Sequence, residues 1–493
     1  MTRPNIVWLT VDSLRYDHTS LAADPAAPGL TPNLARLADD GVSFPNAFSH
    51  AIWTQPSSAS ILSGTYPSVH GVGLRDHNER LPSGLATVPE LLGAAGYRTA
   101  CISEMGNVGP ATGLDRGFDR YHPPHVSRSN TVLLREHYRE LLTHAARHVL
   151  PNLHHVEEWL DRGVERLKDG AMPMLTNAVV ERQVDAFRRS DDPFFVYAHY
   201  NSPHVPNAPP RTYIDADAFE MSVADAIAFS EGLYTGVSSK RRAIARGFPF
   251  SDDEWAAVRE LYRADVRFID AILAPLAERV RELDDTVLVV TSDHGELFGE
   301  AGGITHRLVT HDAVSHVPLV VAGLDGVASA EDGPSLGAVA DRREGLVQHM
   351  DLMESLVAAG GGDTGQFQGF DLRHEDREYA VVQKGPSPRT ADSFAPYLKH
   401  DASFDTSRYH ETLTTALRSH EHKYVRSEDR AELYALPDEV TDRSADLPDV
   451  TASFAAAYEE WWATYGETIP ESSRAEFDEA LEQQLVDLGY RDA

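Results

Sequence analysis

The sequence is poor in lysine and in cysteine, and it contains no long apolar run. Only five of its 44 basic residues are lysine, against 76 acidic residues, and the net charge is −32. An acidic, lysine-poor surface stays hydrated in concentrated salt, where ions screen the repulsion between carboxylates. We therefore predict a halophilic protein. The lack of a basic face also excludes nucleic acid as an expected partner.

The single cysteine, Cys101, excludes an intrachain disulfide. It lies in the apolar stretch 98–103, so we interpret it as a buried small hydrophobe. No stretch approaches the roughly 18 apolar residues of a membrane span. The first residues lead directly into an apolar strand without a signal-peptide pattern. These features predict no membrane span and a cytoplasmic protein, and no pattern indicates an oligomeric state.

Apolar strand patterns alternate with amphipathic helix patterns along most of the 493 residues. Strands are predicted over 5–11, 97–103, 193–199, 286–292 and 317–323. Helices are predicted over 31–38, 58–62, 87–95, 154–167, 178–188 and 253–283. This alternation predicts an α/β fold in which a mostly parallel central sheet is covered by helices on both faces.

The remaining segments predict accessory parts of the fold. Residues 207–250 have an irregular pattern and are expected to form loops over the site. Short alternating strands between 376 and 440 predict a small antiparallel subdomain, and the tail from 451 is predicted to be helical. We accordingly divide the chain into a catalytic domain, 1–375, and a C-terminal subdomain, 376–493.

Polar groups follow several of the predicted strands. They are Asp12, Thr54, the segment 199–204 and the segment 293–296 with His306 after it. The carboxyl ends of parallel strands converge on one crevice, so these groups are expected to meet. Asp12, Asp293 and His294 would supply two carboxylates and an imidazole, and the Thr54 oxygen a fourth ligand. This donor set suits one divalent ion of Ca, Mg, Mn or Zn.

Several of these segments together resemble the sulfatase family of the alkaline-phosphatase-like superfamily. The segments are PNIVWLTVD at 4–12, WTQPSSASILSGTYPSVHG at 53–71, SDHGE at 292–296 and HVPL at 316–319. The resemblance implies an alkaline-phosphatase-like α/β/α sandwich with a small antiparallel sheet near the C-terminus.

The resemblance also implies roles for single residues. Metal ligands would be Asp12, Asp293 and His294, with Thr54 in the position of the nucleophile. His204 and His306 match substrate-binding or leaving-group positions, and they are the expected catalytic histidines. His199 stands where relatives often carry a histidine, which implies substrate binding.

The sequence departs from the family pattern at the residues that would bind a sulfate group. Thr54 stands where sulfatases carry a cysteine or serine that is oxidised to formylglycine, and threonine is not a substrate for that oxidation. Ser58 replaces an arginine, Ser13 the second aspartate of an Asp-Asp pair, and Ser202 an aspartate. The segment 103–107 lacks the family's lysine and histidine. Three contacts to an anionic group are therefore absent.

These departures favour chemistry at phosphorus. A metal would lower the pKa of the Thr54 hydroxyl, which would attack in line and form a phospho-threonine, while His204 or His306 supports the leaving oxygen. Water or an alcohol acceptor would then take the group. The substrate would be a small-molecule, glycan or lipid ester, and the low number of cations favours a phosphodiester.

Two alternatives stay open. The first is a sulfatase that hydrolyses sulfate esters, with the Thr54 hydroxyl in place of formylglycine. The second is a non-catalytic binder of a sulfated or phosphorylated glycan or lipid.

Overall fold

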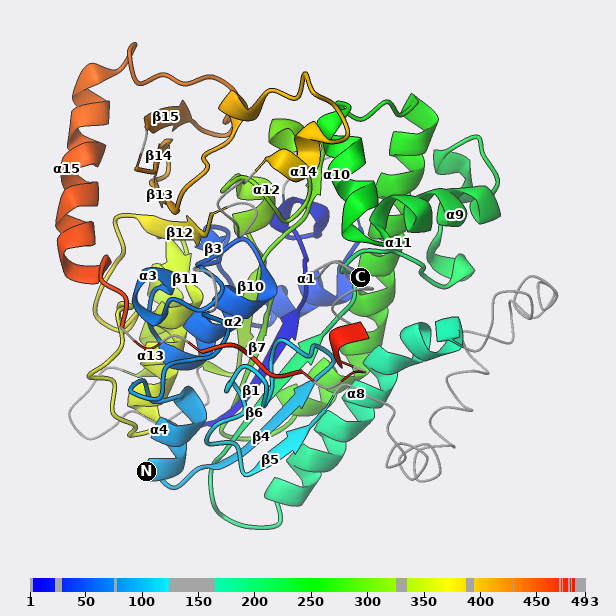
Figure 1. The fold of residues 1–493 in the computed structure, drawn as a ribbon. Helices are drawn as coiled ribbons and strands as arrows, with labels where there is room; N and C mark the ends of the chain where they lie inside the picture. The colour runs from blue at the N-terminus through cyan, green and yellow to red at the C-terminus, as the bar shows by residue number, and fades with distance from the viewer. Residues whose placement is uncertain are drawn as a thin grey trace.

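A seven-stranded, mostly parallel sheet forms the centre of the fold in a computed structural model of the chain (Figure 1). The structure describes residues 3–22, 29–74, 78–123, 165–324, 335–386, 394–428 and 430–469, with parts of 471–483. The strand order is β2-β10-β7-β1-β6-β4-β5. In chain order the strands are β1 (Asn5–Val11), β2 (Val42–Ser43), β4 (Arg98–Ser103), β5 (Arg120–His122), β6 (Phe194–Tyr200), β7 (Thr286–Thr291) and β10 (Leu319–Ala322).

Strand β1 lies at the middle of the sheet and pairs in parallel with β6 and β7. β4 and β5 continue the parallel part, whereas β10 is antiparallel to β7 and β2 is antiparallel to β10. The side chains of β6 and β7 are buried along their whole length. Strands covered on both faces are continuously apolar in this way, and the predicted α/β fold is confirmed.

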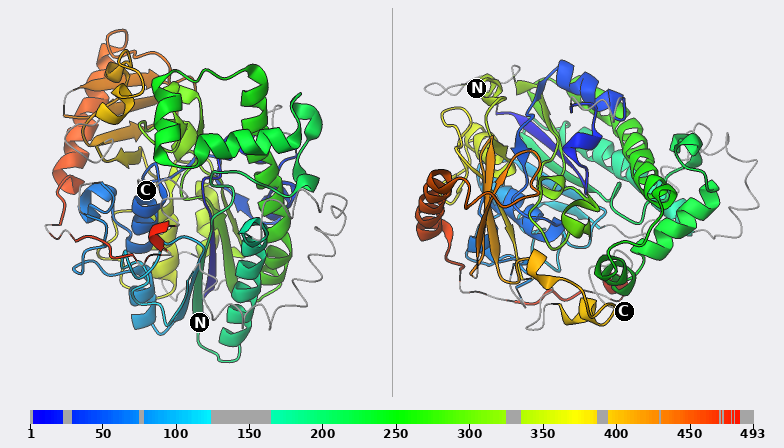
Figure 2. Two further views of the ribbon diagram at one scale, coloured as in Figure 1. Left: turned by 45° about the vertical axis from the view of Figure 1, so that its right-hand side comes forward. Right: turned by 90° about the horizontal axis from the view of Figure 1, so that it is seen from above.

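Helices cover both faces of the sheet (Figures 1 and 2). On one face Val7 and Leu9 of β1 belong to a core with α1 (Pro32–Asp39), α8 (Glu165–Phe187) and α11 (Asp252–Arg281). On the other, Ile6 and Trp8 belong to a core with α2 (Thr54–Ser63), α4 (Val88–Ala94) and α13 (His349–Ala359). Alternate residues of a strand point to opposite faces, so one short strand contributes to both cores.

A second, four-stranded antiparallel sheet follows in the chain and lies to one side of the central sheet (Figure 2). Its strands are β12 (Ala380–Lys384), β13 (Thr414–Arg418), β14 (His422–Arg426) and β15 (Ala431–Ala435). One face packs on α15 (Pro448–Tyr465) through side chains such as Tyr424 and Phe454. On the other face Val382 packs against Val314 of the preceding part of the chain. The predicted small antiparallel sheet is confirmed, while a domain boundary at residue 375 stays a prediction.

Shorter elements connect these parts. They are β3 (Ala47–Phe48), α3 (Pro67–His70), β8 (Leu297–Phe298), β9 (Ile304–Thr305), α12 (Asp312–Ser315), β11 (Val347–Gln348) and α14 (Ala395–Leu398). Short 3-10 turns lie at Tyr16–His18, Arg211–Tyr213, Ala216–Ala218, Glu300–Gly302, Leu336–Arg342 and Thr406–Arg408. Within the described ranges, none of the helices is long and apolar enough to cross a membrane.

The prediction of irregular loops over 207–250 is wrong for much of that segment. It contains two helices, α9 (Val223–Tyr234) and α10 (Val237–Ala245). The Ser222 side chain caps α9 by accepting a bond from the Asp225 backbone, and Ile227 packs against Leu261 of α11. Gly232 within α9 and Gly236 between the two helices obscured the pattern in the sequence. The helix predicted over 154–167 lies almost entirely outside the described residues.

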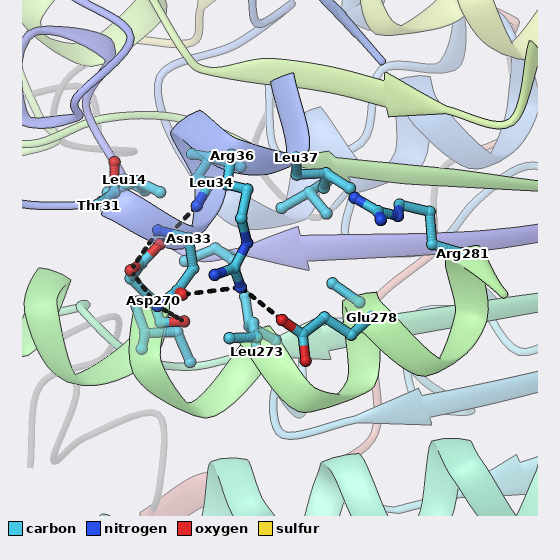
Figure 3. Close-up of a pocket in the computed structure, with 15 residues that line it drawn as sticks. Leu14, Thr31, Asn33, Leu34, Arg36, Leu37, Asp270, Leu273, Glu278 and Arg281 are labelled. Carbon is cyan, nitrogen blue, oxygen red and sulfur yellow. Dashed lines mark hydrogen bonds and ion pairs between the residues drawn. The ribbon is translucent and has the colours of Figure 1, made fainter. Parts of the chain in front are cut away.

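The start of helix α1 is capped by a side chain of another helix (Figure 3). Thr31 precedes the helix, but its hydroxyl accepts a bond from the Ser20 amide and caps nothing. Instead, the carboxylate of Asp270 on α11 accepts bonds from the amides of Asn33 (3.1 Å) and Leu34 (2.9 Å). Beside this contact lies a cavity of about 40 Å³, lined by apolar side chains such as Leu273.

Candidate active site

The candidate site lies where three neighbouring strands end together. Thr10 of β1 pairs with His199 of β6 on one side and with Thr291 of β7 on the other. Asp12 therefore follows β1 at the same level at which Asp293 follows β7. All three side chains, Asp12, His199 and Asp293, are completely buried.

Thr54 reaches this edge from the first turn of α2, which begins at Thr54 and not at residue 58 as predicted. Its Oγ1 lies 3.2 Å from Asp12 Oδ2 and 3.2 Å from His294 Nε2. Trp53 is the N-cap residue and forms no side-chain cap bond. The positive end of the helix therefore lies at Thr54, an arrangement that favours an anion.

The two carboxylates and two imidazoles form one tight group. His199 Nε2 lies 3.6 Å from Asp12 Oδ2 and 3.7 Å from Asp293 Oδ2. His294 Nε2 lies 3.5 Å from Asp12 Oδ1 and 3.6 Å from Asp293 Oδ2. The structure thus brings together all of the side chains that the sequence suggested as metal ligands.

This group fits a divalent cation. Asp12, His199 and Asp293 each offer a ligand atom within 4.8 Å of the others. Asp293 Oδ2 and His199 Nε2 are buried and have no hydrogen-bond partner among the described residues. A buried carboxylate without a partner is strongly unfavourable unless a positive charge lies beside it. His199, which the sequence assigned to substrate binding, is therefore also placed to bind a cation.

The electrostatics of the two carboxylates differ. Burial and the neighbouring Asp12 carboxylate raise the pKa of Asp293 above its usual range. Burial also opposes ionisation of Asp12, but the imidazoles of His204, His199 and His294 outweigh it and lower the Asp12 pKa. Two carboxylates this close cannot both ionise easily without a cation between them.

Hydrogen bonds to the backbone fix the orientation of two histidines. His294 Nδ1 donates to the Gly295 carbonyl at 2.8 Å, and His204 Nδ1 donates to the Val205 carbonyl at 2.6 Å. The proton is thereby held on Nδ1, so each Nε2 carries a lone pair. The lone pair of His294 faces Thr54, as a ligand or a proton acceptor must.

His204 and His306 lie together on one side of the site. Their ring centroids are 5.1 Å apart, and the His306 ring lies 4.5 Å from that of His294. Burial lowers the pKa of His204 to about 4. Burial, with His294 and His204 nearby, also lowers the pKa of His306. Both imidazoles are therefore neutral at neutral pH.

No motif in the sequence predicted the cationic group Lys240, whose charge acts on this side of the site. Lys240 on α10 is only 5% exposed, and its charge lowers the pKa values of His204 and His306. Burial and Arg307 in turn lower the pKa of Lys240 to about 7, against the opposing effect of Glu296. A lysine in a lysine-poor chain was the available signal, but its segment was interpreted as loops.

Glu296 was also missed as a separate group. It is completely buried, and its Oε2 lies 3.4 Å from His306 Nδ1. The carboxylate therefore orients the imidazole of His306.

Other residues of the motif have structural contacts. His70 lies between Ser60 Oγ (3.1 Å) and the Val72 amide (3.0 Å), and these contacts tie the turn after α2 to the helix. Ser13, in place of the family's aspartate, donates from Oγ to Asp12 Oδ1 at 2.8 Å. Ser58 Oγ, in the arginine position, is buried and has no partner among the described residues.

The buried side chains at this edge of the sheet could hold a metal ion, and comparison with known proteins shows the family to which the chain belongs. The family model "Sulfatase" matches residues 4–362, so the chain belongs to the sulfatase family. Human iduronate 2-sulfatase is 25% identical over 342 residues, covering 64% of this chain and 59% of the relative. Choline-sulfatase of Rhizobium meliloti is 26% identical over 341 residues, covering 65% and 63%. The matches span less than two thirds of these relatives.

A solved structure shares the fold over nearly the whole chain. The phosphonate monoester hydrolase of Agrobacterium radiobacter superposes with a TM-score of 0.64 at 19% identity, covering 94% of this chain and 96% of that one. At this identity the likeness establishes the fold alone.

Proposed function

We propose that this protein is a metal-dependent phosphoester hydrolase or transferase that acts on phosphodiesters through Thr54. The observation that carries the proposal is the position of the Thr54 hydroxyl. It lies at the N-terminus of α2, 3.2 Å from a carboxylate oxygen of Asp12 and 3.2 Å from His294 Nε2. A hydroxyl so placed serves as the nucleophile itself and needs no conversion to formylglycine.

Asp12, Asp293 and His294 would hold one divalent ion together with the Thr54 oxygen, and His199 lies close enough to join them. A cation bound there would acidify the Thr54 hydroxyl and bind a non-bridging oxygen of the substrate.

Different residues of the chain then carry out the separate steps of the reaction. Thr54 Oγ1 attacks phosphorus, its proton passing to an acceptor such as Asp12 Oδ2, and a phospho-threonine forms as the bond to the leaving oxygen breaks. His204 or His306 gives a proton to that oxygen, because an arriving anion raises the pKa of a neighbouring imidazole. Water or an alcohol then attacks phosphorus and releases Thr54. Backbone amides at the start of α2 stabilise the anion.

The charge of the site supports a diester. With serine at position 58 and no lysine or histidine in 103–107, few cations face the nucleophile. A diester carries one negative charge where a monoester at neutral pH carries close to two. When protonated, Lys240 adds a positive charge that acts on His204 and His306.

Sulfate-ester hydrolysis is the second candidate, supported by the family and by the names of the relatives. A formylglycine sulfate can expel sulfate by elimination, whereas a threonine sulfate must be hydrolysed by attack at sulfur. Turnover is expected to be slow by that route. A non-catalytic binder is the third candidate, but it gives no reason for the complete group around Thr54.

The test is turnover by the purified protein in molar KCl, with aryl phosphate monoester, phosphodiester, phosphonate monoester and sulfate ester. Each substrate is offered with Ca, Mg, Mn or Zn. We expect metal-dependent phosphodiester turnover, and a phosphorylated Thr54 trapped by acid quenching and found by mass spectrometry.

Variants at position 54 provide the controls. Thr54→Val removes the hydroxyl at nearly constant volume and should abolish turnover, whereas Thr54→Ser should retain part of it. Sulfate-ester turnover without phosphodiester turnover would reject the proposal. Metal binding without turnover of any ester would favour a binding protein.

A further inference from the structure

The chain after α15 returns to the helix that carries Thr54 (Figure 1). We call the described residues of 466–475 the C-terminal strap. The strap lies against the segment that follows α2, although about 400 residues separate the two in sequence. The sequence analysis expected only an acidic helical tail here.

Backbone and side-chain bonds hold the strap in place. The Thr468 hydroxyl donates to the Ser68 carbonyl at 2.6 Å, and the Ile469 amide donates to the Val69 carbonyl at 2.9 Å. Further along, Glu471 Oε2 accepts bonds of 2.9 Å from the amide and the hydroxyl of Ser83. The strap is therefore anchored on both sides of the residues between 69 and 83.

Glu79 connects the strap to the nucleophile helix. Its amide donates to the Ser473 carbonyl at 3.0 Å, and its Oε2 accepts a 3.0 Å bond from the Ala475 amide. Its own carbonyl accepts a 2.6 Å bond from Gln55 Nε2. Gln55 follows Thr54 in the first turn of α2 and is 3% exposed.

This connection matters because α2 begins without a side-chain cap. The first turn of a helix has backbone amides without partners in the helix itself, so side-chain contacts help to hold it. In α2, Ser57 Oγ donates to the Asp293 carbonyl at 2.6 Å, and the bond from Gln55 Nε2 is a further contact of this turn. The bond from Gln55 to Glu79 ties that turn to a segment which the strap itself holds. A nucleophile must keep its position closely, since a misplacement of about 1 Å can cost a reaction roughly 100-fold.

We propose that Glu79 is a positioning residue, through which the C-terminal strap fixes Gln55 and the first turn of α2 and so holds the Thr54 hydroxyl in its attacking position. This inference rests on the proposed function for its effect on turnover. The effect on the mobility of α2 does not depend on that function.

The first experiment is a double-mutant cycle between Glu79→Ala and Gln55→Met, measured as kcat and KM on the phosphodiester. Each single variant should lower kcat by roughly 10-fold or more and leave KM nearly unchanged, because the nucleophile and not the bound substrate is misplaced. Glu79→Ala removes the side-chain bond from the Ala475 amide but keeps the backbone carbonyl that accepts from Gln55. In the Gln55→Met background it should lower kcat by less than about a further twofold, because α2 is then no longer bonded to the segment that Glu79→Ala loosens.

Controls separate positioning from general stability. Glu79→Gln keeps a side-chain oxygen for the Ala475 amide and should restore kcat. Glu459→Ala removes an exposed acid of α15 whose partner is Arg426, and it should leave kcat unchanged. Multiplicative losses of kcat in the double variant would overturn the proposal. An equal loss in Glu459→Ala would also overturn it.

The second experiment needs no turnover. Hydrogen exchange of the peptide that covers 54–63 is compared between the full chain, Glu79→Ala, and a chain that ends at residue 465. Exchange in the first turn of α2 should rise at least about tenfold in both variants, while β1 and β7 keep their protection. Unchanged exchange of α2 would overturn the proposal. If the unaltered protein turns over no ester but α2 exchange rises as expected, the proposed function fails and the positioning by the strap stands.

Discussion

Two buried polar clusters of this molecule differ in charge balance. The site cluster consists of Asp12, His199 and Asp293, with two carboxylates and no lysine or arginine among its members. The interface cluster joins the four-stranded sheet to α12 and consists of Lys423, Arg418, Asp312 and Glu439.

In the interface cluster, lysine and arginine side chains lie against the carboxylates. Lys423 is completely buried and donates to Glu439 Oε2 (2.7 Å), the Thr310 carbonyl (3.0 Å) and Asp312. Burial opposes ionisation of Asp312, but Lys423 and Arg418 outweigh it and hold the Asp312 pKa below its usual range. Two cations therefore match two carboxylates.

The site cluster leaves its charges unmatched. Asp293 Oδ2 has no hydrogen-bond partner within the described residues, whereas both carboxylates of the interface cluster accept a bond from Lys423. The pKa directions do not separate the clusters, because each has one carboxylate with a lowered pKa, Asp12 or Asp312, and one with a raised pKa, Asp293 or Glu439. Charges that are paired inside a protein serve the fold, whereas a buried group left unpaired indicates a ligand. The comparison thus separates a candidate catalytic cluster from a structural one on physical grounds.

The largest effect is expected from Asp293→Asn. Loss of a metal ligand should lower kcat/KM at least about 1,000-fold, because a cation supplies several kcal/mol of stabilisation to the transition state. Without metal the variant should be no less stable than the unaltered protein, since one of two repelling carboxylates has lost its charge. Melting curves with and without a chelator check this, and a chelator-dependent shift retained in Asp293→Asn would contradict the assignment.

Lys423→Met is the matched change in the interface cluster. It leaves Asp312 and Glu439 buried without their lysine, so the free energy of unfolding should fall by about 3–5 kcal/mol. The exposed Lys399→Met serves as the control and should change it by less than about 0.5 kcal/mol. Urea unfolding measures both. A small effect of Lys423→Met would show that charge balance does not distinguish the clusters.

Asp270→Ala tests a buried carboxylate that accepts hydrogen bonds from backbone amides at the start of α1. It removes the bonds to the Asn33 and Leu34 amides of α1, and the free energy of unfolding should fall by about 1–2 kcal/mol. Thr31→Val should lower the free energy of unfolding by less, because the Thr31 hydroxyl does not cap α1. Urea unfolding of the two variants shows which residue caps α1. A larger loss of unfolding free energy in Thr31→Val than in Asp270→Ala would reject the interpretation.

Glu354→Gln tests a partly buried carboxylate at which burial and neighbouring acids outweigh the charge of Arg373. Burial and the carboxylates of Asp351, Asp371 and Glu375 raise the pKa of Glu354 to about 7. The folded state then holds the proton more tightly than the unfolded state, so stability is lost as pH rises through about 7. The variant should therefore be more stable above pH 7, by about 1 kcal/mol after solvent screening, and equal in stability below about pH 4. Melting temperatures across this range measure the effect, and a difference independent of pH would contradict it.

Much of the fold could be predicted because its strands are buried on both faces. Continuous apolar runs such as 5–11 and 286–292 have few alternatives, and they form β1 and β7 almost as expected. α9 and α10 escaped prediction because their apolar faces are short and glycines lie within or between them. Strand β10 pairs with β7 in the antiparallel direction. Tertiary contacts determine this direction, and no local sequence pattern indicates it.

The candidate site was predictable for a related reason. Polar residues directly after apolar strands lie at one edge, so Asp12, Asp293 and His294 could be grouped without coordinates. Two features of the site were not predictable. His199 was expected to bind substrate, but its position against both carboxylates had no signal in the sequence. Lys240, whose charge acts on His204, lies on a helix with no motif.

The sequence by itself determined the sheet, its polar edge and the threonine in the nucleophile position, because strand burial and residue chemistry are local properties. Only the tertiary structure decided which buried charges are paired, that Asp270 caps α1, and that the C-terminal strap reaches Glu79. These depend on contacts between residues tens to hundreds of positions apart, where neither spacing nor composition limits which side chains meet.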